Sequence, residues 1–104
     1  MSLQVKKRTN ELSAFDIKKI QDAIKKAFEA VDKVYTDDII ELLSLRVCAN
    51  FAPKIIDNTI SIEDIQDSVE VILIQAGYVD VSKAYILYRK QHEITYFRLQ
   101  INSW

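Results

Sequence analysis

Two groups of basic residues could bind an anion. The strand-like stretch Val5-Lys6-Lys7-Arg8 is followed ten residues after Arg8 by the pair Lys18-Lys19, at the start of a helical pattern. Arg89 and Lys90 form a second group near the other end of the chain. Ammonium and guanidinium groups form strong charge-assisted hydrogen bonds with phosphate oxygens. The residue types therefore predict a polyphosphate site, provided that the fold brings both groups together.

The pattern of the remaining reactive residues predicts binding without catalysis. One glycine cannot build a glycine-rich phosphate loop, and Cys48 has no evident activating base. We interpret Cys48 as a small core hydrophobe and assign no role to His92, which has no metal or triad partner in the sequence. Tyr85 and Tyr88 are interpreted as core residues with their hydroxyls at the surface, not as a base-stacking pair.

Composition limits the function classes. The 104 residues are 49% hydrophobic, which is enough for one domain with its own core. The net charge of −1 gives no basic excess, so we expect no nucleic-acid partner. A single cysteine fits a reducing compartment. The sequence shows no apolar run near the ~20 residues of a membrane span and no signal peptide, so we expect no membrane partner and a cytoplasmic location.

Apolar spacing predicts four helices. In the first, Ile17, Ile20, Ile24, Phe28 and Val31 share one face. The chain has one proline and one glycine, and these should end the second helix and the third helix respectively. The residues predicted to cap the four helix starts are Asp16, Thr36, Ser61 and Asp80. Short connections between the helices favour a compact bundle.

The N-terminal segment has a different pattern. Residues 4–8 and 12–15 are two short stretches that flank Thr9-Asn10-Glu11, and Asn10 tolerates a positive φ, so a β-hairpin is predicted. An isolated hairpin is marginal in water, so it must lie on the end of the bundle. Thr59-Ile60-Ser61 could add a third strand. The predicted fold is mainly α (α+β): a four-helix bundle capped by a hairpin or a three-stranded sheet.

Four segments together resemble a known family. They are Val5-Lys6-Lys7-Arg8, Phe15-Asp16-Ile17-Lys18-Lys19-Ile20, Ile65-Gln66-Asp67-Ser68-Val69-Glu70 and Lys83-Ala84-Tyr85-Ile86-Leu87-Tyr88-Arg89. In this order they resemble the ATP-cone domain, the nucleotide-binding regulatory module at the N-terminus of many ribonucleotide reductases. The last segment looks most like the anaerobic, glycyl-radical class. The resemblance implies a cone over residues 1–93, with residues 94–104 as a tail or the start of a linker to a missing domain.

The resemblance also implies a ligand and its contacts. The effector would be ATP or dATP, with Mg²⁺ as an accompanying ion. Val5 would offer backbone groups to adenine, Lys7 and Arg8 would contact phosphates, and Lys19 and Lys90 would approach from two helices. The implied site comprises Val5, Lys7, Arg8, Ser13, Asp16, Lys19, Ile20, Ile62, Arg89 and Lys90.

This sequence departs from the family pattern at several places. Thr9-Asn10 replaces the usual Asp-Gly turn, and Asn10 can supply the backbone conformation of that glycine. Ser13 stands where many members have Glu, Asp16 where Asn is frequent, and Ile62 where some have Thr. The last three departures concern sugar recognition and the discrimination between ATP and dATP.

The resemblance further implies partners: the catalytic domain of a reductase, a second subunit, and other copies of the chain in a homo-oligomer. The start Met1-Ser2-Leu3 and the apolar tail favour a fragment of a longer protein. Two alternatives remain open at this point. One is a helical protein–protein interaction module with an incidental basic hairpin. The other is the cone of a nucleotide-sensing transcriptional repressor, although this chain lacks the cysteines of that family's zinc ribbon.

Overall fold

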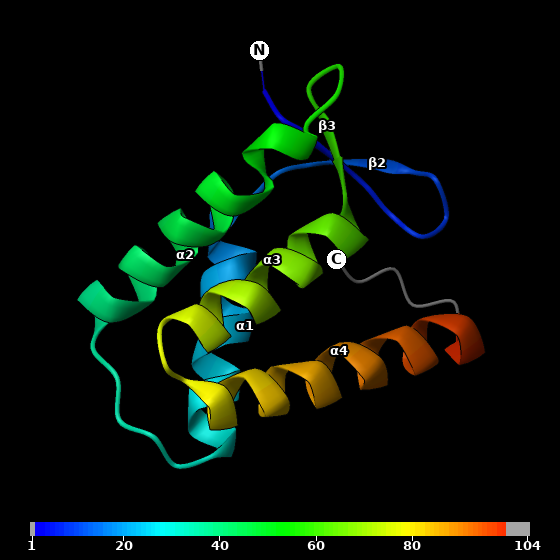
Figure 1. The fold of residues 1–104 in the computed structure, drawn as a ribbon. Coiled ribbons are helices and arrows are strands. Elements are labelled where there is room, and N and C mark those ends of the chain that lie inside the picture. The colour runs from blue at the N-terminus through cyan, green and yellow to red at the C-terminus, as the bar shows by residue number, and fades with distance from the viewer. Residues whose placement is uncertain (1, 100–104) are drawn as a thin grey trace.

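The chain folds into four helices and a small sheet (Figure 1). The structure is a computed structural model that describes residues 2–99, with side chains described as far as Glu93. The elements, in order, are β1 (Gln4–Lys6), β2 (Leu12–Ala14), α1 (Ile17–Ala30), α2 (Asp37–Phe51), the 3₁₀ turn η1 (Ala52–Lys54), β3 (Thr59–Ser61), α3 (Ile62–Gln75) and α4 (Val79–Leu99). The predicted α+β class is confirmed, and the third strand is present.

The sheet has the order β2-β1-β3, with β1 in the centre. β1 pairs antiparallel with β2 and parallel with β3, so Val5 lies between Ser13 and Ile60. Figure 1 shows the sheet at the end of the bundle where α2 ends and β3 leads into α3. β1 ends at Lys6, which is earlier than the predicted stretch, so Lys7 and Arg8 belong to the turn.

Local chemistry explains the turn and the helix starts. Asn10 adopts a φ of 71°, as predicted from its tolerance of the left-handed region. The side chains of Asp16, Thr36 and Ser61 each accept a hydrogen bond from a backbone N–H of the first turn, so these three caps are confirmed. The prediction for Asp80 is wrong, because α4 already begins at Val79. Asp80 lies inside the first turn, where a carboxylate favours the positive end of the helix dipole.

A continuous core joins the sheet to the helices. Val5 and Ile60 from the sheet are at most 1% exposed and belong to the same apolar cluster as Phe28 and Phe51. Phe15, between β2 and α1, contacts Phe51 edge to face with 5.8 Å between ring centroids. Cys48 is partly buried against this core, and burial raises the pKa of its thiol. The sheet is therefore fixed to the bundle through Val5 of β1, Ile60 of β3 and Phe15, which follows β2.

Helix α4 packs against α1 and α3 and extends past the predicted domain end at residue 93 to Leu99. The division at residue 93 stays a prediction, because the tail from residue 100 onward and the side chains beyond Glu93 lie outside the described part. Over residues 2–99, none of the helices is both long enough and apolar enough to cross a membrane.

Candidate nucleotide site

A small cavity of about 40 Å³ lies where the β1–β2 turn meets α1, α3 and α4. Its volume is room for a few water molecules. Its walls are largely apolar, and its polar groups come from the turn and from all three helices. The lining residues are Arg8, Lys19, Ile20, Ala23, Ile62, Ile65, Gln66, Val69, Tyr85, Tyr88 and His92.

Arg8 is a cation of this cavity whose contacts the structure defines in detail. Its Nη2 atom donates a hydrogen bond to Oε1 of Gln66 at 2.8 Å, and the side chain is only 9% exposed. Its Nε atom lies 3.5 Å from Oε1 of Glu63 but makes no hydrogen bond within the described part of the chain. A buried donor without a hydrogen bond costs roughly 1–3 kcal/mol. A phosphate oxygen at the cavity could satisfy this donor.

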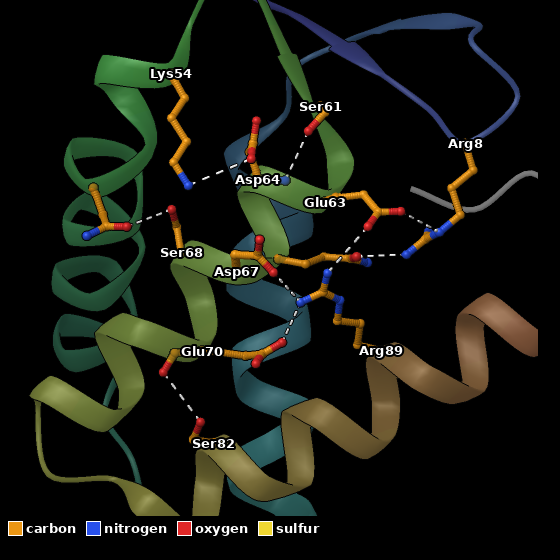
Figure 2. A network of polar contacts seen from close by, with 12 residues as sticks. Arg8, Lys54, Ser61, Glu63, Asp64, Asp67, Ser68, Glu70, Ser82 and Arg89 are labelled. Atoms are coloured by element: carbon orange, nitrogen blue, oxygen red, sulfur yellow. Dashed lines mark hydrogen bonds and ion pairs between the residues drawn. The ribbon is translucent and has the colours of Figure 1, made fainter.

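Glu63 connects Arg8 to a second arginine (Figure 2). Arg89 of α4 points toward α3, where it forms ion pairs with Glu63, Asp67 and Glu70. Burial by itself would lower the pKa of Arg89, but the hydrogen bonds to Asp67 and Glu70 outweigh that effect and raise it. Arg89 is thus a permanent cation already surrounded by carboxylates, and it does not line the cavity.

The structure brings together part of the predicted site. Arg8, Lys19, Ile20 and Ile62 line the same cavity. Lys90 lies instead with Arg89, along a separate depression of about 220 Å³.

The other predicted residues lie outside the cavity. Val5 and Ser13 face each other across the sheet, and the carboxylate of Asp16 accepts a hydrogen bond from the N–H of Lys18. Lys7 lies in the turn, where its carbonyl accepts from the N–H of Asn10. The nucleotide contacts predicted for these residues stay predictions.

A larger, open groove of about 560 Å³ runs between α1 and α4. Lys26, Lys83 and Asp80 are among its lining residues, but Arg8 and Lys19 are not. We place the candidate site in the smaller cavity because Arg8, with its buried donor, and Lys19 both line it.

A model of the family described as the ATP cone domain matches residues 3–94. The chain belongs to the ATP cone family. This domain is regulatory rather than catalytic, and it binds nucleotides. The cone is 37% identical over 90 residues to the ribonucleoside-diphosphate reductase subunit alpha of Chlamydia pneumoniae, a match that covers 81% of the chain. It is 33% identical over 97 residues to the corresponding subunit of Chlamydia muridarum, which covers 86% of the chain. In both cases the match spans 9% of the relative's length.

The predicted site lacks seven of the eleven residues that line this cavity, among them Gln66, Tyr88 and His92. Gln66 lies four residues after Ile62, and His92 lies four residues after Tyr88, so each pair shares a helix face. Helical spacing from the predicted residue Ile62 could have identified Gln66. The surface hydroxyl expected for Tyr85 is wrong: the residue is 4% exposed, and burial strongly raises the pKa of its phenol.

Proposed function

We propose that this cone binds ATP or dATP as an effector at the Arg8 cavity and thereby regulates a ribonucleotide reductase. The observation that carries the proposal is that Arg8 and Lys19 line one cavity, and that the buried Nε of Arg8 makes no hydrogen bond with the described residues. Such a pair of cations suits the oxygens of a polyphosphate. The family match and the reductase relatives support the same function.

Binding requires the cavity to open. Pockets for drug-sized ligands measure roughly 300–1,000 Å³, far more than the 40 Å³ found here. The bond from Arg8 to Gln66 spans the turn and α3, so an entering nucleotide would separate these two residues. The nucleotide would then shift the turn toward an open arrangement. The size of this shift is set by the difference between its affinities for the open and the closed turn. This movement is the step by which an effector could alter the surface offered to a neighbouring domain.

The affinity that this site can supply is sufficient for an effector. Hydrogen bonds to charged groups contribute roughly 1.5–3 kcal/mol each. Two or three of these, together with apolar contact to the base, approach the ~8 kcal/mol of a micromolar dissociation constant. Mg²⁺ enters the proposal only as an ion carried by the triphosphate.

Titration calorimetry of the purified chain with ATP, dATP and CTP tests the proposal. We expect binding of ATP or dATP with micromolar affinity, clearly weaker binding of CTP, and no steady release of phosphate from ATP. Repeating the ATP titration with EDTA shows whether Mg²⁺ contributes. Equal, weak heats for all three nucleotides, or sustained ATP hydrolysis, would contradict the proposal.

The setting of the domain belongs to the same proposal. We propose that its partners are the catalytic domain of the reductase, a second subunit and other copies of the chain, in the cytoplasm. The relatives are named as diphosphate reductases, whereas the resemblance of the last segment favours the anaerobic class. The sequence of the full-length gene decides between the two classes, because an anaerobic enzyme would carry a glycyl-radical domain.

A further inference from the structure

His92 lies on the same cavity as the two cations. It sits one turn after Tyr88 on α4, and the two rings are 4.3 Å apart between centroids, tilted by 46°. Both side chains line the cavity together with Arg8 and Lys19. His92 is the single histidine of the 104 residues. The cavity therefore contains one group whose charge can change near neutral pH.

Within the part of the chain whose side chains are described, the charged groups around His92 are mainly cationic. The titratable and charged groups that face it there are Arg8 of the β1–β2 turn, Lys19 and Lys26 of α1, and Tyr85 and Tyr88 of α4. Helix α3 contributes the neutral Gln66, which accepts a hydrogen bond from Nη2 of Arg8, and Glu63, whose carboxylate lies 3.5 Å from Nε of Arg8. Partial burial, followed by repulsion from Lys26 and Arg8, lowers the pKa of His92 below 6.5. The lowered pKa favours the neutral form of the imidazole in the free protein.

We propose that His92 is a third phosphate-binding group of this cavity, and that it takes up a proton from solvent when the polyphosphate enters. This inference rests on the proposed function. A polyphosphate carries more negative charge than Arg8 and Lys19 together can neutralise, so the cavity changes from a cationic to an anionic environment for the imidazole. The protonated ring then donates a hydrogen bond to a phosphate oxygen, which neutral histidine can do from only one nitrogen.

Two pH dependences follow, with opposite signs. In the free protein the folded state holds the proton of His92 less tightly than the unfolded chain does. Its contribution to stability is therefore complete above pH 6.5 and is lost as pH falls toward the lower folded pKa. For nucleotide binding the bound state holds the proton more tightly, so affinity rises as pH falls. Between the pKa values of His92 in the free and bound states, each unit by which pH falls should raise the affinity for the nucleotide by up to about tenfold, relative to a His92→Gln variant.

The single histidine makes the decisive measurement direct. An NMR titration of the His92 imidazole in the whole chain, with and without saturating ATP, gives its pKa in both states. We expect a value below 6.5 without ATP and a clear increase with ATP. If Arg8→Ala weakens ATP binding but ATP leaves the pKa of His92 unchanged, this inference is wrong while the proposed function stands. Absence of any ATP binding would overturn the proposed function as well.

Calorimetry provides a second readout and a matched control. Titrating ATP near pH 6.5 in two buffers of different ionisation enthalpy measures the protons taken up on binding. We expect net uptake to fall in His92→Gln, and His92→Lys to bind ATP with the weaker pH dependence of a fixed cation. Gln91→Ala, at the adjacent position on the α1–α4 groove, should retain the wild-type pH profile. Equal proton uptake by the wild-type chain and His92→Gln would contradict the inference.

Discussion

Replacing Arg8 with alanine is expected to weaken ATP binding about tenfold or more, where one decade corresponds to ~1.4 kcal/mol. The guanidinium is nearly buried at the cavity, and its Nε donor has no hydrogen bond in the described part of the chain. A phosphate would satisfy that donor, and alanine cannot. Lys19→Ala should also weaken binding, but less, because Lys19 is exposed to solvent. Calorimetry with ATP measures both effects.

Lys6→Ala is the matched control for Arg8→Ala. Lys6 carries the same charge, ends strand β1 and is exposed, but it does not line the cavity. We expect nearly wild-type affinity for this variant. Lys7→Ala should fall between the two, since Lys7 lies in the turn near Arg8. If Lys6→Ala were the most damaging of the three substitutions, the placement of the ligand at Arg8 would be wrong.

Phe51→Ala is expected to destabilise the fold by about 3–5 kcal/mol, the usual loss when a buried Phe is truncated to Ala. Phe51 is 1% exposed at the end of α2. It packs against Phe15, which joins strand β2 to helix α1. The substitution would therefore open a cavity at the point where the sheet is fixed to the bundle. Denaturant unfolding, followed by circular dichroism, measures the loss.

Leu42→Ala is the control for this stability prediction. Leu42 lies on the same helix but is 54% exposed. Exposed positions of this kind usually change stability by no more than ~0.5 kcal/mol. A loss for Leu42→Ala as large as that for Phe51→Ala would contradict the assignment of the effect to core packing, because alanine has the higher helix propensity.

The helix starts could be predicted because a cap is a local feature. Asp16, Thr36 and Ser61 each bond to a backbone N–H within three residues, and this distance is visible in the sequence. Asp80 shows the limit of such reasoning. An acid in the first turn and an acid at the cap give similar sequence patterns, and only the backbone distinguishes them.

The site could be predicted only in part because its contacts are long-range. Arg8 and Gln66 are 58 positions apart, and no periodic pattern links a turn to the face of a distant helix. In the sequence, Arg89 and Arg8 are both cations within the cone-like segments, and nothing there distinguishes their surroundings. Its environment is set by the packing of α4 on α3, which places three carboxylates around it. His92 could not be placed at the cavity from the sequence, because Lys26 and Arg8, which besides burial lower its pKa, come from α1 and from the β1–β2 turn.

The first stretch of the predicted hairpin runs from residue 4 to residue 8, but β1 ends at Lys6. Side chains alternate only within a strand, and the turn that follows carries Arg8 toward α3. The residue at which the strand ends therefore determines which basic residue reaches the cavity.

Amide hydrogen exchange with and without ATP tests the central claim, that a nucleotide binds at the Arg8 cavity, most directly. We expect slower exchange on ATP binding in residues 4–15, at the start of α3 around residues 62–66, and in α4 around residues 85–92. The middle of α2, around residues 43–47, should change little, because it lies in the core away from the cavity. Exchange that slows uniformly along the chain, or that leaves residues 4–15 unchanged, would contradict the claim.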